Sequence, residues 1–183
     1  MSSTATNQHS VLSNLQVEAA TDLLSTHSIQ AQIIPDASAE IDWTKPSYVS
    51  VLGAIGKDIV FSSTVNIHQD LLIRLHPLGV SHVSDADLAD WCRELNNQIV
   101  GRMKNKLLRY GASVVLGLPV LLTGTRVRTV AAPDATVHRH AFQTPDGSIE
   151  LTLESLVDPA LELYKQESLE EEAVMLEGAL ALF

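Results

Sequence analysis

The stretch that decides the fold is Ser84–Gly111, SDADLADWCRELNNQIVGRMKNKLLRYG. Ser84 is a preferred N-cap residue, and Asp87 stands three residues later, where it can complete a capping box. Gly111 suits the position just after a helix, because glycine adopts a positive φ without steric cost. The sequence therefore predicts one long helix that runs from about residue 85 to Tyr110.

The two sides of this helix differ in composition. At 100° per residue, one broad face is apolar and must be turned toward the core. It carries Leu88, Trp91, Cys92, Leu95, Ile99 and Met103. The opposite face carries a narrow line of residues, here called the polar stripe, which consists of Asp90, Glu94, Asn97, Gly101 and Lys104. Most polar helix faces are simply solvated, so spacing alone does not make this stripe a site.

Three positions of the polar stripe present a carboxylate and a carboxamide outward, beside a place where another surface could come close. Glu94 and Asn97 are three residues apart, so their side chains are neighbours on the helix surface. Gly101 lies one turn beyond Asn97, where the missing Cβ lets another surface approach the helix backbone. A glycine here costs roughly 1 kcal/mol relative to alanine. Asn96 is turned roughly 100° from Asn97 and points away from the Glu94 side.

The segments on either side of this helix predict an α+β domain. Helical spacing of apolar residues predicts a first helix within residues 10–26, after a disordered stretch over residues 1–9. Residues 48–66 predict a hairpin that turns at residues 56–58, and residues 67–77 a short helix that ends at a proline. After the long helix, four strands are predicted, over residues 113–124, 126–133, 137–144 and 148–156.

Residues 157–183 are predicted to form an acidic amphipathic helix outside the main domain. The apolar residues of this segment recur at steps of three and four, and they are Leu169, Ala173, Leu176, Leu180 and Phe183. Such a seam either packs on a sheet face of the same domain or contributes to a dimer.

Composition narrows the classes of function. The chain has 183 residues, of which 45% are hydrophobic, so one domain can bury a substantial core. Its formal net charge is −10 and it has no basic cluster, which argues against nucleic acid as a partner. No apolar run approaches the ~20 residues that span a bilayer, so a cytoplasmic protein with no membrane association is expected. Cys92 is the only cysteine and is expected to be a buried, inert thiol.

The polar stripe also resembles a known motif. Residues 90–107 are similar to the signature helix of the CheC/CheX/FliY family of chemotaxis phosphatases, whose pattern D/S-x-x-x-E-x-x-N is matched by Asp90, Glu94 and Asn97. Gly101 stands where the CheX branch usually carries glycine. In the expected order, residues 48–65 resemble the opening hairpin of the family. Residues 116–124 likewise resemble its L-P-x-x-x-x-G strand, and residues 138–153 its closing hairpin. The resemblance covers roughly residues 10–156 and implies a CheC-like fold, with a long central helix on a mixed or antiparallel sheet.

This resemblance implies an activity and a partner. The family dephosphorylates the aspartyl phosphate of CheY-like response regulators. The resemblance implies that Asn97 orients the attacking water and that Glu94 anchors the active-site lysine of the regulator. It also implies that Asp90, Gly101 and Lys104 contact the partner. The only metal implied is Mg²⁺ bound by the regulator, with no cofactor of the protein's own. A neutral amide can donate to and accept from a water without adding negative charge beside a phosphoryl group.

The chain departs from the family pattern in one respect. Members with two sites carry the motif on two helices, whereas the first helix here has Glu18 but Thr21 in place of the asparagine. In having a single motif, the chain resembles the CheX branch of the family. That branch forms homodimers, so two sites per dimer are implied. The alternative function is not enzymatic: the chain would be a non-catalytic, dimeric CheX-like interaction module in two-component signalling.

A third hypothesis is a metal site. His138 and His140 lie two apart in a predicted strand and hence on one face of it, a spacing that can ligate Zn²⁺. A metal site needs three or four convergent ligands, and no acidic or cysteine ligand pattern stands nearby. Ordinary surface histidines are therefore the favoured interpretation.

Overall fold

A single antiparallel sheet forms the frame of the molecule. The computed structural model describes residues 3–35, 44–77, 83–127 and 129–164. Its strands are β1 (Gln32–Pro35), β2 (Ser47–Gly56), β3 (Ile59–His68), β4 (Val114–Leu116), β5 (Val120–Gly124), β6 (Thr136–Thr144) and β7 (Gly147–Val157). The strand order is β1-β6-β7-β3-β2-β4, and β5 pairs with β2 beside β4. The fold is α+β, as predicted.

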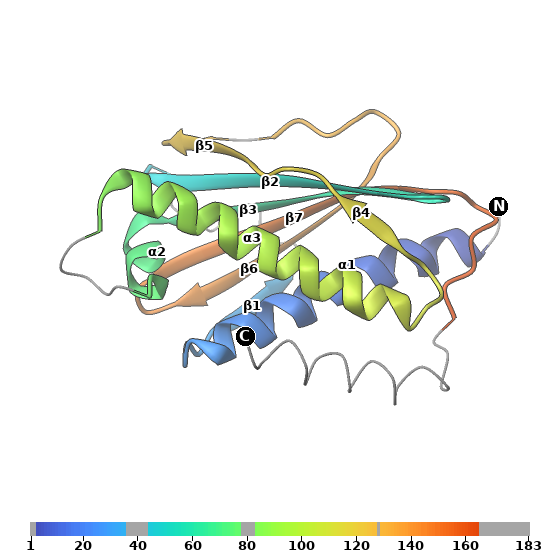
Figure 1. Cartoon of the computed structure of the whole chain (residues 1–183), viewed down its shortest axis with the longest axis horizontal. Coiled ribbons are helices and arrows are strands. Elements are labelled where there is room, and N and C mark those ends of the chain that lie inside the picture. The colour runs from blue at the N-terminus through green and yellow to red at the C-terminus, as the bar shows by residue number, and fades with distance from the viewer. Residues whose placement is uncertain (1–2, 36–43, 78–82, 128, 165–183) are drawn as a thin grey trace.

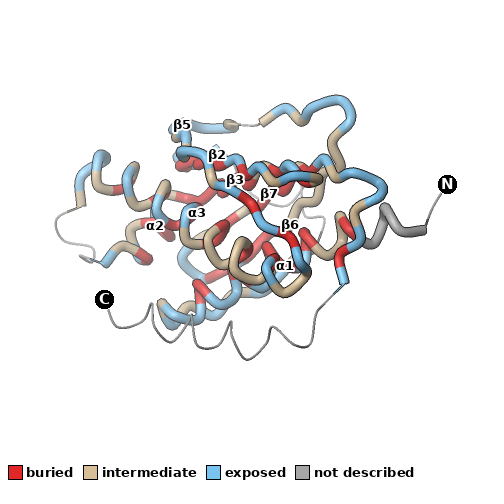
Figure 2. Tube along the Cα trace, turned by 45° about the vertical axis from the view of Figure 1, so that its right-hand side comes forward, coloured by how far each residue is buried: buried red, intermediate tan, exposed pale blue. Residues whose placement is uncertain are grey.

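Two long helices cover one face of this sheet. They are α1 (Ser3–Thr26) and α3 (Asp85–Leu108), while the short α2 (Gln69–Leu75) follows β3 directly. In Figure 1, α3 crosses the sheet diagonally and α1 runs beside it. Alternate residues of the central strands, such as Leu52, Val65 and Leu151, join both helices in one buried cluster. Figure 2 shows buried residues in red along the strands and along the helices that cover them. We call the other side of the sheet the far face.

The long helix begins as the sequence predicts and ends slightly earlier. The Ser84 side chain accepts from the backbone N–H of Asp87, and the Asp87 side chain accepts from the backbone N–H of Ser84, so the capping box is complete. The helix ends at Leu108 rather than at Tyr110. Gly111 then takes a φ of 72°, and the amide of Ala112 bonds back to the carbonyl of Leu107. The left-handed glycine therefore closes the helix, as expected.

A buried carboxamide fixes α3 on the sheet. Asn96 has 0% of its surface exposed. Its Nδ2 donates to the carbonyl oxygens of Ser50 on β2 and Ser63 on β3, at 2.9 and 3.0 Å. Its Oδ1 accepts from Ser63 Oγ at 3.0 Å. Gln16 of α1 donates to the same Ser63 hydroxyl at 2.9 Å. One hydrogen-bond network therefore joins both helices to the two central strands.

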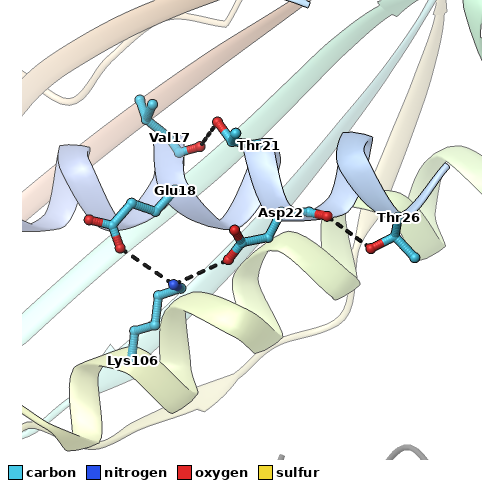
Figure 3. Close-up of polar contacts among 6 residues, drawn as sticks. All are labelled: Val17, Glu18, Thr21, Asp22, Thr26 and Lys106. Atoms are coloured by element: carbon cyan, nitrogen blue, oxygen red, sulfur yellow. Dashed lines mark hydrogen bonds and ion pairs between the residues drawn. The ribbon is translucent and has the colours of Figure 1, made fainter. Parts of the chain in front are cut away.

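An ion-pair cluster joins the two helices on their outer side (Figure 3). Lys106 of α3 lies 3.4 Å from a carboxylate oxygen of Glu18 and 3.2 Å from one of Asp22, both on α1. The Lys106 side chain is only 19% exposed, whereas both carboxylates are more than half exposed. Exposed carboxylates limit the gain in stability, so the main effect is to fix the two helices relative to each other.

Several sequence-based expectations are wrong in detail. The first helix begins at Ser3, so residues 3–9 belong to it rather than to a disordered tail. Residues 126, 127 and 129–133 are not a strand but part of the connection from β5 to β6. The strand predicted over residues 113–124 is interrupted at Pro119, and its two halves pair separately with β2. β1 lies in a segment whose pattern favours neither helix nor strand.

The predicted C-terminal helix is only partly described. Residues 158–164 are not helical. Leu163 is buried in the core cluster between sheet and helices, and Leu161 packs against it. Residues 165–183, which carry the apolar seam, lie outside the described residues.

Replacing Asn96 should destabilise the fold, whereas replacing its neighbour should not. Asn96→Leu keeps the volume but leaves the Ser50 and Ser63 groups without their buried partner. It should therefore lower the free energy of unfolding by about 2–4 kcal/mol. Urea denaturation followed by circular dichroism measures this change. Asn97→Ala, at an exposed position, is the matched control and should change stability by no more than about 0.5 kcal/mol. Equal losses in the two variants would contradict the anchoring role of Asn96.

Candidate functional site

The structure places the polar stripe on the solvent side of α3. Asp90, Glu94 and Asn97 are exposed, while Gly101 and Lys104 are partly exposed. The predicted core face is also confirmed, because Leu95 and Ile99 are buried. Trp91 differs only in being half-buried, edge-on to the rings of His27 and His76. The stripe therefore presents a carboxylate and a carboxamide side by side, with the sheet behind them.

Glu94 is held in place by a neighbour on the next turn. Gln98 Nε2 donates to Glu94 Oε1 at 3.0 Å. The other carboxylate oxygen stays available to a cation in solution, because an ionised carboxylate accepts several hydrogen bonds. Gln98 is absent from the predicted site, although its position four residues after Glu94 is the spacing that brings helix side chains together. Asp90, in contrast, pairs with Arg93.

Asn97 carries the free amide of the stripe. Among the described residues, no side chain forms a hydrogen bond with it, so its donor and acceptor groups both face solvent. Its neighbour Asn96 is saturated inside the protein. Two adjacent asparagines therefore have opposite roles, and the prediction that Asn96 lies outside the exposed stripe is confirmed.

Gly101 is not required by the packing of the chain itself. A Cβ built at this position would meet no atom within 4 Å. The helix therefore accepts the conformational cost of a glycine at a place where the rest of the molecule would tolerate a side chain. The bare backbone beyond Asn97 is open to an approaching surface.

The first helix does not carry a second site of the same kind. Glu18 is engaged by Lys106, and the Thr21 hydroxyl donates to the carbonyl of Val17 at 2.8 Å. Figure 3 shows both residues in these contacts. The carboxylate that corresponds to Glu94 thus serves the contact between α1 and α3, and no free amide stands beside it.

The histidine pair lies beneath α1 rather than on an open surface. His140 Nε2 and Ser13 Oγ of α1 are hydrogen-bonded at 2.7 Å. His138 is half-buried, and its Nε2 is a buried atom without a hydrogen-bond partner. Burial, together with the charge of His138, lowers the pKa of the nearby His9. The interpretation as surface histidines is therefore wrong. The part of the chain that the structure describes contains no group of three or more metal-ligating side chains.

The fold is that of CheC-like and CheX proteins. No protein-family model and no curated protein sequence matches the chain. Among solved structures, the chemotaxis protein CheX from Vibrio vulnificus matches at a TM-score of 0.70 and 14% identity, over 79% of this chain and 99% of that one. A CheC-like superfamily protein from Shewanella sp. PV-4 matches at 0.69 and 16%, over 80% and 97%. CheX in the CheX–CheY–BeF₃–Mg²⁺ complex from Borrelia burgdorferi matches at 0.61 and 15%, over 78% and 96%.

At these identities the likeness establishes the fold. The chain has the CheC-like fold, and the resemblance predicted from residues 10–156 is confirmed at that level. No helix within the described residues is both long enough and apolar enough to span a membrane.

The single thiol should be unreactive in the native protein. Cys92 is fully buried on the core-facing side of α3, and burial raises the pKa of its thiol to about 12. The nucleophilic thiolate is therefore scarce at neutral pH, and reagents cannot reach the sulfur. A chromogenic disulfide reagent at pH 8 should titrate less than a tenth of one thiol per chain. After unfolding in guanidinium, it should titrate one thiol per chain. Rapid labelling of the native protein would contradict this burial.

Proposed function

We propose that this protein is a CheX-like phosphatase that removes the aspartyl phosphate of a CheY-like response regulator. The observation that carries the proposal is the outward pairing of Glu94 and Asn97 on a helix of a CheC-like fold. Support for the partner comes from a protein of the same fold that is seen in complex with CheY. The chain would act in the cytoplasm, in chemotaxis or another two-component pathway, as a homodimer with two sites.

In the proposed reaction, Asn97 places a water opposite the leaving oxygen. The water oxygen attacks phosphorus, and the bond between phosphorus and the aspartate oxygen breaks. The carboxylate of the regulator leaves as an anion, and inorganic phosphate keeps the oxygen and both protons of the water. The Asn97 amide can accept a hydrogen bond from this water and donate one to a phosphoryl oxygen. It adds no charge beside a group that is already negative, and its contribution is one of position.

Glu94 is proposed to bind the regulator rather than to take part in the bond changes. Its carboxylate would pair with the active-site lysine of the regulator, which fixes the register of the two surfaces. The hydrogen bond from Gln98 holds the carboxylate before the partner arrives. Gly101 lets the partner approach the helix backbone closely, and Lys104 and Asp90 lie along the same contact line. Mg²⁺ held by the regulator would balance the phosphoryl charge.

Asn97→Ala should abolish the acceleration of regulator dephosphorylation while leaving the fold intact. Phosphate release from the phosphorylated regulator with Mg²⁺ should slow by roughly 100-fold or more relative to wild type, because a positioned group in the transition state is lost. Asn14→Ala is the matched control, since it removes the same side chain from an exposed position on the other long helix, α1, and it should retain wild-type rates. A near-wild-type rate for Asn97→Ala would mean that the catalytic amide lies elsewhere. If wild type leaves the lifetime of every candidate phospho-regulator unchanged, the non-catalytic interaction module becomes the better description.

Glu94→Gln should weaken recognition more than chemistry. The substitution removes the charge but keeps the size and the hydrogen bond to Gln98. The Kd for the phosphorylated regulator should rise by about tenfold, equivalent to about 1.4 kcal/mol, while kcat falls much less. Saturation kinetics separate the two quantities. Raising the salt concentration should weaken wild-type binding more than binding of the variant, because only the wild-type contact carries a charge. A fall in kcat with an unchanged Kd would assign Glu94 to the chemical step.

A further inference from the structure

The two halves of α1 are held on the sheet in different ways. The C-terminal half packs through four residues of the core cluster, Ala19, Ala20, Leu23 and Leu24. The N-terminal half combines Leu12 and Leu15 of that cluster with polar side chains that bond to the strands. These polar residues are His9, Ser13 and Gln16. They are spaced by four and three residues, so they follow one line along the helix. Attachment of the N-terminal half therefore depends partly on polar groups.

Three histidines meet between this half of α1 and the strands β6 and β7. His9 Nδ1 lies 2.7 Å from Ser155 Oγ of β7, and His140 Nε2 of β6 lies 2.7 Å from Ser13 Oγ. Ser13 and Ser155 are 4% and 1% exposed, so both hydrogen bonds lie inside the interface. His138 shares a face of β6 with His140, because the two residues are two apart in a strand.

His138 is poorly placed to carry a charge in this layer. It stands opposite Leu153, a residue of the core cluster, and its Nε2 is buried without a hydrogen-bond partner. In the neutral ring this nitrogen can remain an unprotonated acceptor, with the proton on Nδ1. A protonated ring carries a proton on both nitrogens, so a charged donor would be buried without an acceptor. Protonation therefore favours an arrangement in which water reaches this nitrogen.

His9 responds to the same surroundings. Burial, and after it the charge of His138, lower the pKa of His9 below its ordinary value of 6.5. An open pocket of about 360 Å³ lies beside the ring, so water can deliver a proton to it. The charged residues that line this pocket with His9 are Lys57, Asp58, Asp134 and Asp158. The three carboxylates do not compensate for burial and for His138, because the pKa is lowered on balance.

The other charged residues of the surrounding elements point elsewhere. Those of β6 and β7 alternate with the histidine and leucine positions and therefore point to the far face, and they are Arg139, Glu150 and Glu154. On α1, Glu18 and Asp22 pair with Lys106 on the outer side of the helix. Next to His140, the residues paired with it are Leu151 of β7 and Pro35 of β1.

We propose that His9, His138 and His140 form an acid-sensitive latch, which holds the N-terminal half of α1 on the sheet at neutral pH and releases it as the pH falls. Charges on these rings repel one another across a partly buried layer, where water screens them weakly. The serine hydroxyls can donate or accept, so they bond to either form of a histidine. The cost of acid thus lies in confining charge, and opening the layer relieves it. The latch does not depend on the proposed phosphatase activity.

Release would stop short of the long central helix. Gln16 lies at the end of this half of α1 and donates to Ser63 Oγ at 2.9 Å, and Ser63 Oγ in turn donates to Asn96 at 3.0 Å. If Gln16 leaves, Asn96 still donates to the carbonyl oxygens of Ser50 and Ser63. The central helix α3 therefore stays docked while α1 opens beside it.

The direction of the pH dependence follows from His9. Because its pKa is lowered in the folded chain, its contribution to stability is fully present above pH 6.5 and is lost as the pH falls through the lowered pKa. A comparison of pH 7.5 with pH 5.0 spans this change. Aspartate and glutamate, whose ordinary pKa values are about 4, stay mostly ionised at both values.

Hydrogen exchange followed by mass spectrometry tests the latch in the full chain. Exchange times are scaled to the intrinsic rate at each pH. Backbone amides within residues 3–16 should lose at least about tenfold in protection at pH 5.0, whereas those of α3 should change by less than about twofold. Equal protection of residues 3–16 at both pH values would overturn the proposal. An equal loss in α3 would also overturn it, because the chain would then be unfolding as a whole.

Variants without the titrating rings test the role of the histidines. His138→Leu removes the unpaired nitrogen and should keep the protection at pH 7.5 while reducing its loss at pH 5.0. The triple variant adds His9→Asn and His140→Gln, which keep polar atoms near Ser155 and Ser13 but take up no proton. Its protection should differ by less than about twofold between the two pH values.

His27→Asn is the matched control. His27 follows the other end of α1 and packs against Trp91, away from β6 and β7. This variant should keep the full acid response of residues 3–16. A response that persists in the triple variant, or that is lost in His27→Asn, would show that other groups cause it and would refute the latch.

Discussion

The carboxamide of Asn96 is the interaction on which the arrangement of the molecule depends. Apolar packing alone allows a helix to rotate or slide on a sheet, because dispersion contacts have little directional preference. The bonds from Asn96 to Ser50 and Ser63 are directional and buried, so they admit one rotation of α3 and one position along β2 and β3. With that rotation fixed, Glu94 must face solvent.

Helical periodicity was sufficient to predict the polar stripe, because a long amphipathic helix with clear caps has only one way to divide its faces. It could not predict the function of Asn96, since a carboxamide on the edge of an apolar face looks the same whether it is bonded or solvated. β1 was missed because four residues hold too little pattern. The segment 126–133 has the β-branched residues of a strand, but residues 126, 127 and 129–133 pair with no strand in the described structure, and pairing is a tertiary property. The burial of His138 and His140 depends on α1, which is distant in sequence.

The two long helices each carry an outward glutamate, and the two glutamates have different roles. Both carry a glutamate on an outward turn, yet Glu18 faces Lys106 of the neighbouring helix, whereas Glu94 faces solvent. The difference arises from the position of each helix on the sheet rather than from the local sequence. Of the two long helices that the structure describes, only α3 therefore presents its glutamate to solvent beside a free amide.

The adjacency of Asn96 and Asn97 separates two demands that usually conflict. Residues that recognise a partner tend to be strained or poorly packed, and changing them then disturbs stability. Here Asn96, which holds the fold, points into the core, and the next residue, Asn97, points into solvent. Substitutions along the outer line of α3 can therefore alter what is recognised at little cost to folding. A scaffold of this kind can be adapted to new partners one surface residue at a time.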